Sequence, residues 1–502
     1  MKSKLFLILL LVIAISLTGC QKREPLNADT IVAKNLKNTE FIPKDRKLHQ
    51  YKIEVELNTD DMTYTGKQYV SYANNTDMDL EEVYFHIYPN AFKSLDNAPV
   101  LFNTGENMQV SSYVPGYIDI HKVLSDDDNL EWNVEGEKET ILHIRLDEPL
   151  KEGEVANLYL EYTVKLPTTK DRFGYHENGI NGGNWYPIAC VYDEDGWNTD
   201  PYYKLGDPFY SEVSNYEVTI ITPKDIVLAS SGNILSEEED GDKTRYNIEG
   251  ALLRDFAWAA SKDFIVKEEI VDDTVIKLYS INDDSDLIER SLDAGVKSIK
   301  TFNKVFGKYP YDQYSIVITE FPSGMEYPSI VFISNDYSQS YLGDVLEKII
   351  VHETAHQWWY GVVGNDEIDE AWLDEGLTTY SEVVYTSETK GSKEGKDYYN
   401  QNIKLGYEYG SSYLGENEIV NKPLSEFEGW NDYGVLVYTR GAMFFHKINE
   451  DFGKDKLYEI LRTYYDKYKF QIAKTEDLIR ICEEITKTSF EPLVKEYLNG
   501  NQ

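Results

Sequence analysis

The stretch V-H-E-T-A-H-Q-W-W at residues 351–359 decides the fold of the region around it. Residues four apart lie on the same face of an α-helix, so the imidazoles of His352 and His356 can reach a single cation. Glu353 lies beside them and is free to accept a proton. The chain has only 8 histidines in 502 residues, so two of them at this spacing indicate a built site.

A third ligand follows in the stretch A-W-L-D-E-G-L at residues 371–377, where Glu375 stands 18 intervening residues beyond His356. Two imidazoles and one carboxylate that leave a fourth position open are typical of catalytic zinc, whereas structural zinc normally uses several cysteines. The chain has only 3 cysteines, which are scattered. The sequence therefore predicts one Zn²⁺ per chain, held by His352, His356 and Glu375. The charge of the zinc ion would lower the pKa of a bound water, and Glu353 would take the proton of that water as general base.

The N-terminus has the pattern of an export signal. Residues 1–4 read M-K-S-K, residues 5–17 are mainly apolar, and residues 17–20 read L-T-G-C. A basic start and an apolar run too short to span a bilayer describe a secretory signal peptide. The L-T-G-C segment resembles a bacterial lipobox, which implies cleavage before Cys20 and diacylation of its sulfur; an ordinary cleaved signal is the alternative.

These features predict a lipoprotein anchored in the cell membrane and exposed on its extracytoplasmic side. The expected segments are a signal peptide over residues 1–19 and the lipidated Cys20 with a polar spacer over residues 20–46. With Cys20 acylated, only Cys190 and Cys482 remain, and they are far apart in sequence. We therefore expect no structural disulfide.

The formal charge of −39 excludes one class of partner. No block rich in Lys and Arg interrupts the acidic sequence, so we expect no binding of nucleic acid or anionic lipid through a basic patch. Peptides are the expected substrates. The oligomeric state stays open at this stage.

The hydrophobic pattern divides the body of the chain in two. Alternating apolar and polar residues indicate strands in the first part, which we bound at residues 47–268, and no long helical pattern precedes residue 284. Helical patterns dominate the second part, residues 269–502. The expected strands include residues 51–57, 83–87, 158–164, 216–220 and 314–320. The expected helices include one that begins near residue 344 and carries the first motif, and others at residues 287–302, 370–385, 434–452, 456–468 and 475–485, with Thr475 as an N-cap.

The spacing of the ligands, with H-Q-W-W and W-L-D-E-G around them, resembles the M1 family of zinc aminopeptidases among the gluzincins. Thermolysin-type enzymes have one more residue in the gap and a different context after it. Two further segments are similar to family motifs: S-G-M-E-Y at residues 323–327 to its G-x-M-E-N motif, and Y-T-R-G-A at residues 438–442 to its Y-x-K-G-A segment. Residues 185–187 and 216–220 are similar to strands of its N-terminal domain.

The resemblance implies an α+β multidomain fold. Its first part would be an N-terminal antiparallel β saddle-like domain, followed by a thermolysin-like, mainly helical catalytic domain. Only 64 residues follow Tyr438, so the chain is similar to a short bacterial lipoprotein form without the C-terminal helical domain that roofs the active site in many members. That form would have a more open cleft and accept longer peptides.

The resemblance also implies roles for individual residues. Tyr438 would donate a hydrogen bond to the developing oxyanion, with Tyr433 as the less favoured alternative. The motif at residues 323–327 departs from the family at Ser323 and Tyr327 but keeps its glutamate, which would bind the free N-terminus of the peptide. The implied substrate-binding residues are Gly324, Met325 and Glu326, with Glu177 as a second contact for the amine.

Together these features predict a zinc metallopeptidase, a hydrolase that removes N-terminal residues through a zinc-bound water with Glu353 as general base. An endopeptidase with the same site is the main alternative, because the cleft is expected to be open and Tyr327 alters the exopeptidase motif. A non-catalytic lipoprotein that binds peptides is a further alternative. The sequence leaves open the preferred N-terminal residue, the physiological substrate and the metal used in vivo.

Overall fold

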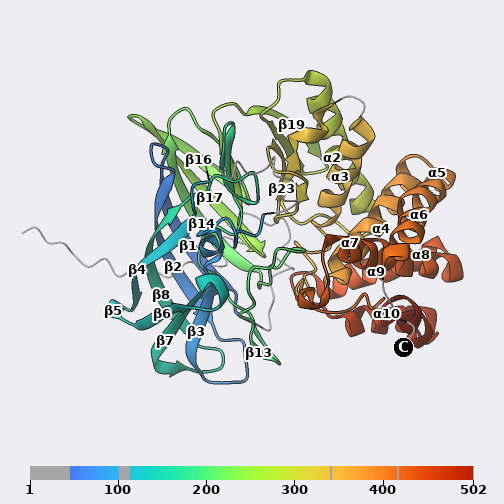
Figure 1. Ribbon diagram of the computed structural model, residues 1–502, viewed down its shortest axis with the longest axis horizontal. Helices are drawn as coiled ribbons and strands as arrows, with labels where there is room; N and C mark the ends of the chain where they lie inside the picture. Colours follow the sequence, from blue (N-terminus) through green and yellow to red (C-terminus); the bar gives the residue numbers. More distant parts are fainter. Residues whose placement is uncertain (1–45, 101–112, 340–341, 415–417, 501–502) are drawn as a thin grey trace, which may run out of the picture.

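The computed structural model describes residues 46–100, 113–339, 342–414 and 418–500. The predicted signal peptide, Cys20 and nearly all of the predicted spacer lie outside the described residues. Strands fill one half of the molecule and helices the other, and the two halves lie side by side (Figure 1). No helix among the described residues is long and apolar enough to cross a membrane.

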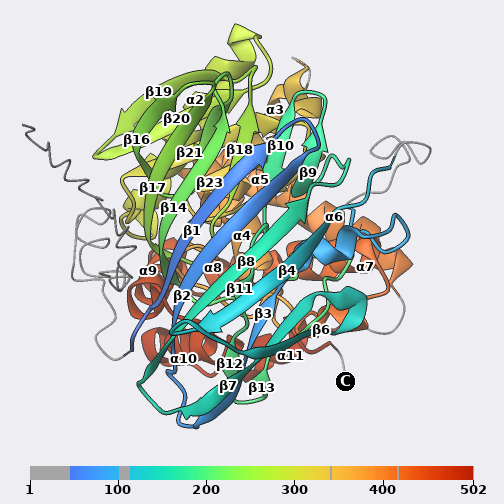
Figure 2. The same cartoon turned by 90° about the vertical axis from the view of Figure 1, so that its left-hand side faces the viewer.

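The largest sheet has eight strands, which face the viewer in Figure 2. Its first strand shows why it forms: Tyr51, Ile53 and Val55 are buried, while the charged residues between them are exposed. In sheet order the strands are β16 (Asn233–Asp240), β17 (Lys243–Leu253), β14 (Ser214–Pro223), β1 (His49–Asn58), β2 (Thr63–Ala73), β8 (Val155–Lys165), β4 (Tyr117–Ser125) and β5 (Asp128–Asn129).

The predicted N-terminal β domain is present, with one correction to its strand directions. Strands β1 and β14 pair in parallel, from His49 opposite Ser214 to Glu56 opposite Ile221, whereas the other pairs of this sheet are antiparallel. The sheet is therefore mixed. An alternating pattern states which face of a strand is buried but not the direction of its neighbour, so sequence periodicity could not reveal this pairing.

Three smaller sheets complete the β half. Aromatic side chains form much of the core between the layers; Trp185 packs edge to face against both Tyr64 and Trp258. The first of these sheets consists of β15 (Val227–Ser230), β18 (Trp258–Ser261), β10 (Gly179–Gly182) and β9 (Phe173–His176), and the second of β11 (Ile188–Ala189), β3 (Leu80–His86), β7 (Ile141–Leu150) and β6 (Glu131–Glu135). The third pairs β12 (Tyr192–Asp193) with β13 (Gly196–Trp197). The β half also has two short helices, η2 (Tyr88–Phe92) after β3 and η4 (Glu137–Glu139) after β6.

A five-stranded sheet begins the second half, and the expected boundary at residue 268 falls within its first strand. Its order is β19 (Ile265–Val271), β20 (Thr274–Ser280), β21 (Gln313–Thr319), β23 (Ile330–Ser334) and β22 (Gly324–Met325). Strand β21 is buried at every position, as expected for an interior strand with parallel neighbours. The short edge strand β22 is antiparallel and carries two of the predicted substrate-binding residues.

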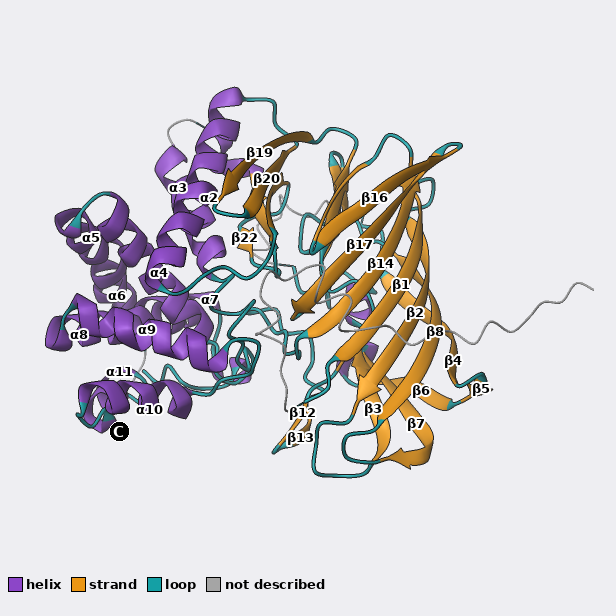
Figure 3. Cartoon of the chain, turned by 180° about the vertical axis from the view of Figure 1, so that it is seen from behind, coloured by secondary structure: helices purple, strands orange, loops and turns teal. Residues whose placement is uncertain are grey.

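Helices form the rest of this half, coloured purple in Figure 3. Thr475 was predicted as an N-cap but is the first residue of α10 (Thr475–Thr486), and Lys474 takes the cap position. The Thr475 hydroxyl is used elsewhere, since its Oγ1 accepts a hydrogen bond of 3.0 Å from Trp372 Nε1. The helices are α2 (Ser285–Val305), η5 (Asn335–Ser338), α3 (Gly343–Ala355), α4 (Trp372–Thr389), α5 (Ser392–Tyr398), η7 (Tyr399–Lys404), α6 (Leu405–Gly410), η8 (Ser411–Tyr413), η9 (Leu424–Glu426), α7 (Trp430–Tyr433), η10 (Gly434–Arg440), α8 (Gly441–Phe452), α9 (Lys454–Tyr468), α10 (Thr475–Thr486) and α11 (Glu491–Tyr497).

Two glycines allow α4 to pack tightly against the junction of η10, a π-helix, with α8. A Cβ atom added to Gly376 would lie 3.0 Å from Gly441 Cα and 3.1 Å from the carbonyl oxygen of Val437. Both obstacles are backbone atoms, so any larger residue would push the two segments apart. The contact fixes α4 next to the segment that carries Tyr438.

Candidate metal centre and active site

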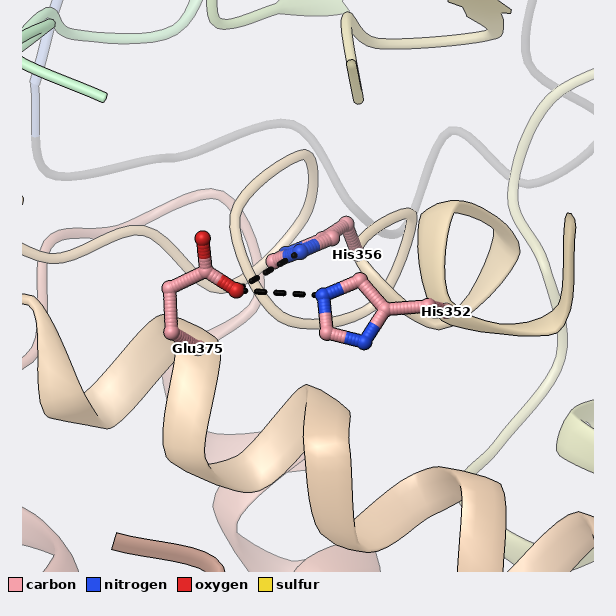
Figure 4. Close-up of side chains that lie close together, drawn as sticks. All are labelled: His352, His356 and Glu375. Carbon is pink, nitrogen blue, oxygen red and sulfur yellow. Dashed lines mark hydrogen bonds and ion pairs between the residues drawn. The ribbon is translucent and has the colours of Figure 1, made fainter. Parts of the chain in front are cut away.

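Helices α3 and α4 bring the three predicted ligands together (Figure 4). The Oε2 atom of Glu375 lies 3.1 Å from His352 Nε2 and 3.4 Å from His356 Nε2. His356 is the C-cap residue of α3 but keeps helical backbone angles, so the four-residue spacing still places both imidazoles on one side. The three side chains point toward a common centre.

The other nitrogen of each imidazole is held by a carboxylate. His352 Nδ1 donates to Glu382 Oε1 at 2.8 Å, and His356 Nδ1 donates to Asp374 Oδ1 at 2.5 Å. These bonds place the ring protons on Nδ1 and leave both Nε2 lone pairs facing Glu375. The rings are therefore oriented as metal ligands.

The arrangement fits zinc. Bonds of ~2.0–2.1 Å to zinc in a tetrahedron require ligand atoms roughly 3.3–3.4 Å apart, and the two nitrogens lie 3.1 and 3.4 Å from the Glu375 oxygen. Burial lowers the pKa of His352, but hydrogen bonds to Glu375 and Glu382 outweigh it and raise that pKa to about 9. A metal cation bound between the imidazoles and Glu375 would take the place of the proton that Glu375 and Glu382 attract to His352.

Glu353 is placed to move a proton. Its side chain lies on the wall of the cavity, and its Oε2 has no hydrogen-bond partner among the described residues. Burial raises the pKa of Glu353 to about 7, against the opposing effect of His352 and His356. Gly324 on β22 leaves room for it, because an added Cβ would lie 2.0 Å from Glu353 Oε1.

Tyr438 lines the cavity, whereas Tyr433 does not. The Tyr438 hydroxyl donates to Glu375 Oε1, and its ring stacks on His352 with centroids 6.0 Å apart. Burial, followed by the charge of Glu375, raises the pKa of Tyr438 well above its ordinary value, so the phenol keeps its proton. Tyr433 packs edge to face behind it, with ring centroids 5.7 Å apart.

The ligands face a cavity of about 240 Å³. Glu326 and Gly324 lie in its wall, whereas Met325 is buried behind them with its Sδ accepting a hydrogen bond of 2.9 Å from Arg172 Nε. Glu177 does not line the cavity; it occupies an exposed turn between β9 and β10. The structure therefore brings Gly324 and Glu326 to the site but not Glu177.

Several residues at the site were not found from the sequence. Asp374 and Glu382 had a usable signal, since the first adjoins a ligand and the second lies seven residues beyond Glu375 on the same helix. Arg172 and Asp207 pair with each other in the cavity wall and come from loops of the β half. No sequence motif marks that pair.

Two histidines and a glutamate that converge with a fourth position open form the ligand set typical of catalytic zinc. Residues 290–497 match the description "Peptidase family M1 domain". Most of the helical half of the chain therefore matches peptidase family M1. This agrees with the resemblance found in the sequence.

Curated relatives are similar over part of their length. Aminopeptidase 2 of Candida albicans is 25% identical over 382 residues, which is 71% of this chain and 39% of that protein. Human Aminopeptidase RNPEPL1 is 30% identical over 191 residues, 35% of this chain and 25% of that protein. The chain thus spans well under half of the length of these relatives.

A solved structure shares the fold over nearly the whole chain. A crystal structure of the M1 zinc metallopeptidase from Deinococcus radiodurans superposes with a TM-score of 0.62 at 13% identity, covering 92% of this chain and 95% of that one. The arrangement of a β half followed by a helical catalytic half is therefore that of a known M1 structure.

We expect Glu382→Gln to weaken zinc binding about 10- to 100-fold, because the neutral amide orients His352 without raising its basicity. Competition with a chromophoric chelator measures the affinity. Glu388→Gln is the matched control: it lies on the same helix but pairs with Lys304 and Lys454, and it should bind zinc like the wild type. Equal affinities for all three proteins would contradict the role of Glu382.

Proposed function

We propose that this protein is a zinc-dependent aminopeptidase that hydrolyses the first peptide bond of its substrates. One observation carries the proposal: the converging His352, His356 and Glu375 share a cavity with a proton acceptor, Glu353, and with a second carboxylate, Glu326. The match of residues 290–497 to the M1 peptidase domain and the names of the relatives, which are aminopeptidases, support the same activity.

His352, His356 and Glu375 would hold the zinc. When bound, the ion supplies a Lewis acid that acidifies water and polarises a carbonyl group. Glu353 then accepts the proton of the attacking water and delivers it to the leaving nitrogen. Its raised pKa suits both steps, because such a group can take and release a proton near neutral pH.

Tyr438 would stabilise the charge that develops on the carbonyl oxygen. It keeps its proton at neutral pH and lies at the cavity wall beside the ligands. A neutral donor held in a buried site stabilises an oxyanion more in the transition state than in the ground state. Its contact with Glu375 ties the donor to the metal ligand set.

Glu326 would select the free N-terminus. It lies in the cavity wall, and its Oε1 has no hydrogen-bond partner among the described residues. A carboxylate at this place can pair with an ammonium group and fix the register, so that only the first peptide bond reaches the centre. Tyr327 does not disturb this role, because its hydroxyl points away and donates to Asn184 Oδ1.

We expect Glu353→Gln to lower kcat by roughly 10²- to 10⁴-fold, because the amide cannot accept the proton. Tyr438→Phe should lower kcat about 10²- to 10³-fold with little change in KM. Steady-state kinetics on an aminoacyl reporter, with zinc content measured in parallel, tests both. Near-normal turnover of Glu353→Gln with full zinc would refute the mechanism.

Glu326→Ala is expected to reduce the preference for a free N-terminus. The test digests one decapeptide in its free and N-acetylated forms with wild type and variant, and mass spectrometry identifies the products. Wild type should release single residues from the free peptide only. Internal cuts in both peptides would support the endopeptidase alternative, and no cleavage by a zinc-loaded protein would support a peptide-binding lipoprotein.

We also propose that Cys20 anchors the protein to the outer face of the cell membrane. The support is the order of basic, apolar and L-T-G-C segments at the N-terminus. In the native host, the wild-type protein should sediment with membranes and incorporate labelled palmitate, whereas Cys20→Ala should do neither. Unlabelled wild-type protein released into the medium would overturn the anchor.

A further inference from the structure

A second group of acidic side chains lies beside the zinc ligands, on the side of His356. It consists of Glu326 after β22, Glu367 in the loop before α4, and Asp374 in the first turn of α4. One carboxylate oxygen from each lies within 4.8 Å of one from each of the others. Their exposed fractions are only 3%, 2% and 1%.

The carboxylates of this group lack partners. Both oxygens of Glu367 are buried without a hydrogen bond from any described residue, and so are Oε1 of Glu326 and Oδ2 of Asp374. The remaining oxygen of Asp374 is occupied by His356 Nδ1. Buried acceptors are almost always satisfied in proteins, so four orphaned oxygens in one place indicate a missing positive group.

The described side chains do not supply that positive group. Arg172 is paired with Asp207. Arg254 directs its N–H groups to the carbonyl oxygens of Tyr360, Ser211 and Gln471. Glu367 forms no ion pair with any lysine, arginine or histidine in the described part of the chain. The zinc proposed above would be held by different atoms and leave these oxygens free.

We propose that Glu326, Glu367 and Asp374 form a second metal site, which binds one hard divalent cation, with calcium as the preferred ion. The available donors are carboxylate oxygens only, which suit calcium, whereas zinc prefers sites with nitrogen or sulfur donors. Calcium also tolerates irregular geometry and takes its remaining ligands from water or backbone carbonyls, while magnesium requires a near-ideal octahedron.

Such an ion would stabilise parts of the catalytic centre that zinc does not reach. It would hold Asp374, which orients His356, and Glu326, whose second oxygen stays available to a substrate amine. It would also join the loop before α4 to the segment after β22. The site is structural, and its binding can be measured whether or not the protein proves to be an aminopeptidase.

The test starts from wild-type protein loaded with one equivalent of zinc in metal-depleted buffer. Isothermal titration with CaCl₂, and elemental analysis after gel filtration, should find one calcium per chain in addition to one zinc. Calcium should raise the Tm. Terbium, which replaces calcium, should luminesce by energy transfer from nearby tryptophans such as Trp372, and calcium should displace it.

Glu367→Gln separates this site from the zinc site. It should bind calcium at least about tenfold more weakly, because one ligand charge is lost, and it should keep its zinc. Its Tm should no longer respond to calcium. Glu370→Gln is the matched control from the same loop; its carboxylate accepts from the Thr475 backbone N–H at 3.2 Å, and calcium binding should be unchanged.

Two results would overturn the second site. Wild-type protein with full zinc that binds no calcium would mean that the three carboxyl groups are held neutral. Retention of a second zinc in place of calcium would mean that the site does not select a hard cation. Failure to bind the first zinc would instead count against the proposed peptidase function, so the two proposals fail separately.

Discussion

The burial of negative charge is the constraint on which this centre depends. Glu326, Glu353, Asp374 and Glu375 are each at most 6% exposed and lie close together. An ionised carboxylate removed from water costs several kcal/mol unless a positive group compensates it. The proposed metal ions would supply this compensation. Metal binding would then stabilise the folded helical half.

The two halves of the molecule contribute different groups to the cavity. The helical half supplies the groups proposed to bind metal and to move protons, on α3, α4 and η10. The β half supplies a wall of the same cavity through the buried pair of Arg172 and Asp207. The halves are fastened close to the site, where the Tyr360 hydroxyl donates to Asp255 and Arg254 Nε donates to the Tyr360 carbonyl. A peptide in the cavity would touch both halves.

The sequence predicted what depends on local spacing. The two histidine ligands lie four residues apart on one helix, and β1 alternates along one strand, so both followed from periodicity. Contacts that depend on tertiary structure were not predicted correctly. The pair of Arg172 and Asp207 was missed because it has no local signal. Glu177 was expected at the cavity but occupies an exposed turn. The parallel partner of β1 was missed for a similar reason, because pairing direction depends on the path of the chain between the strands.

The glycine contact between α4 and the start of α8 affects how the centre can move. Gly376 follows the ligand Glu375, and Gly441 lies three residues after Tyr438. Backbone meets backbone there, with no flexible side chain between to absorb a shift. The metal ligand and the phenol are thus mounted on one rigid unit. Any adjustment of their separation during turnover must come from bond rotation within the two side chains, which takes far less time than the sliding of whole helices.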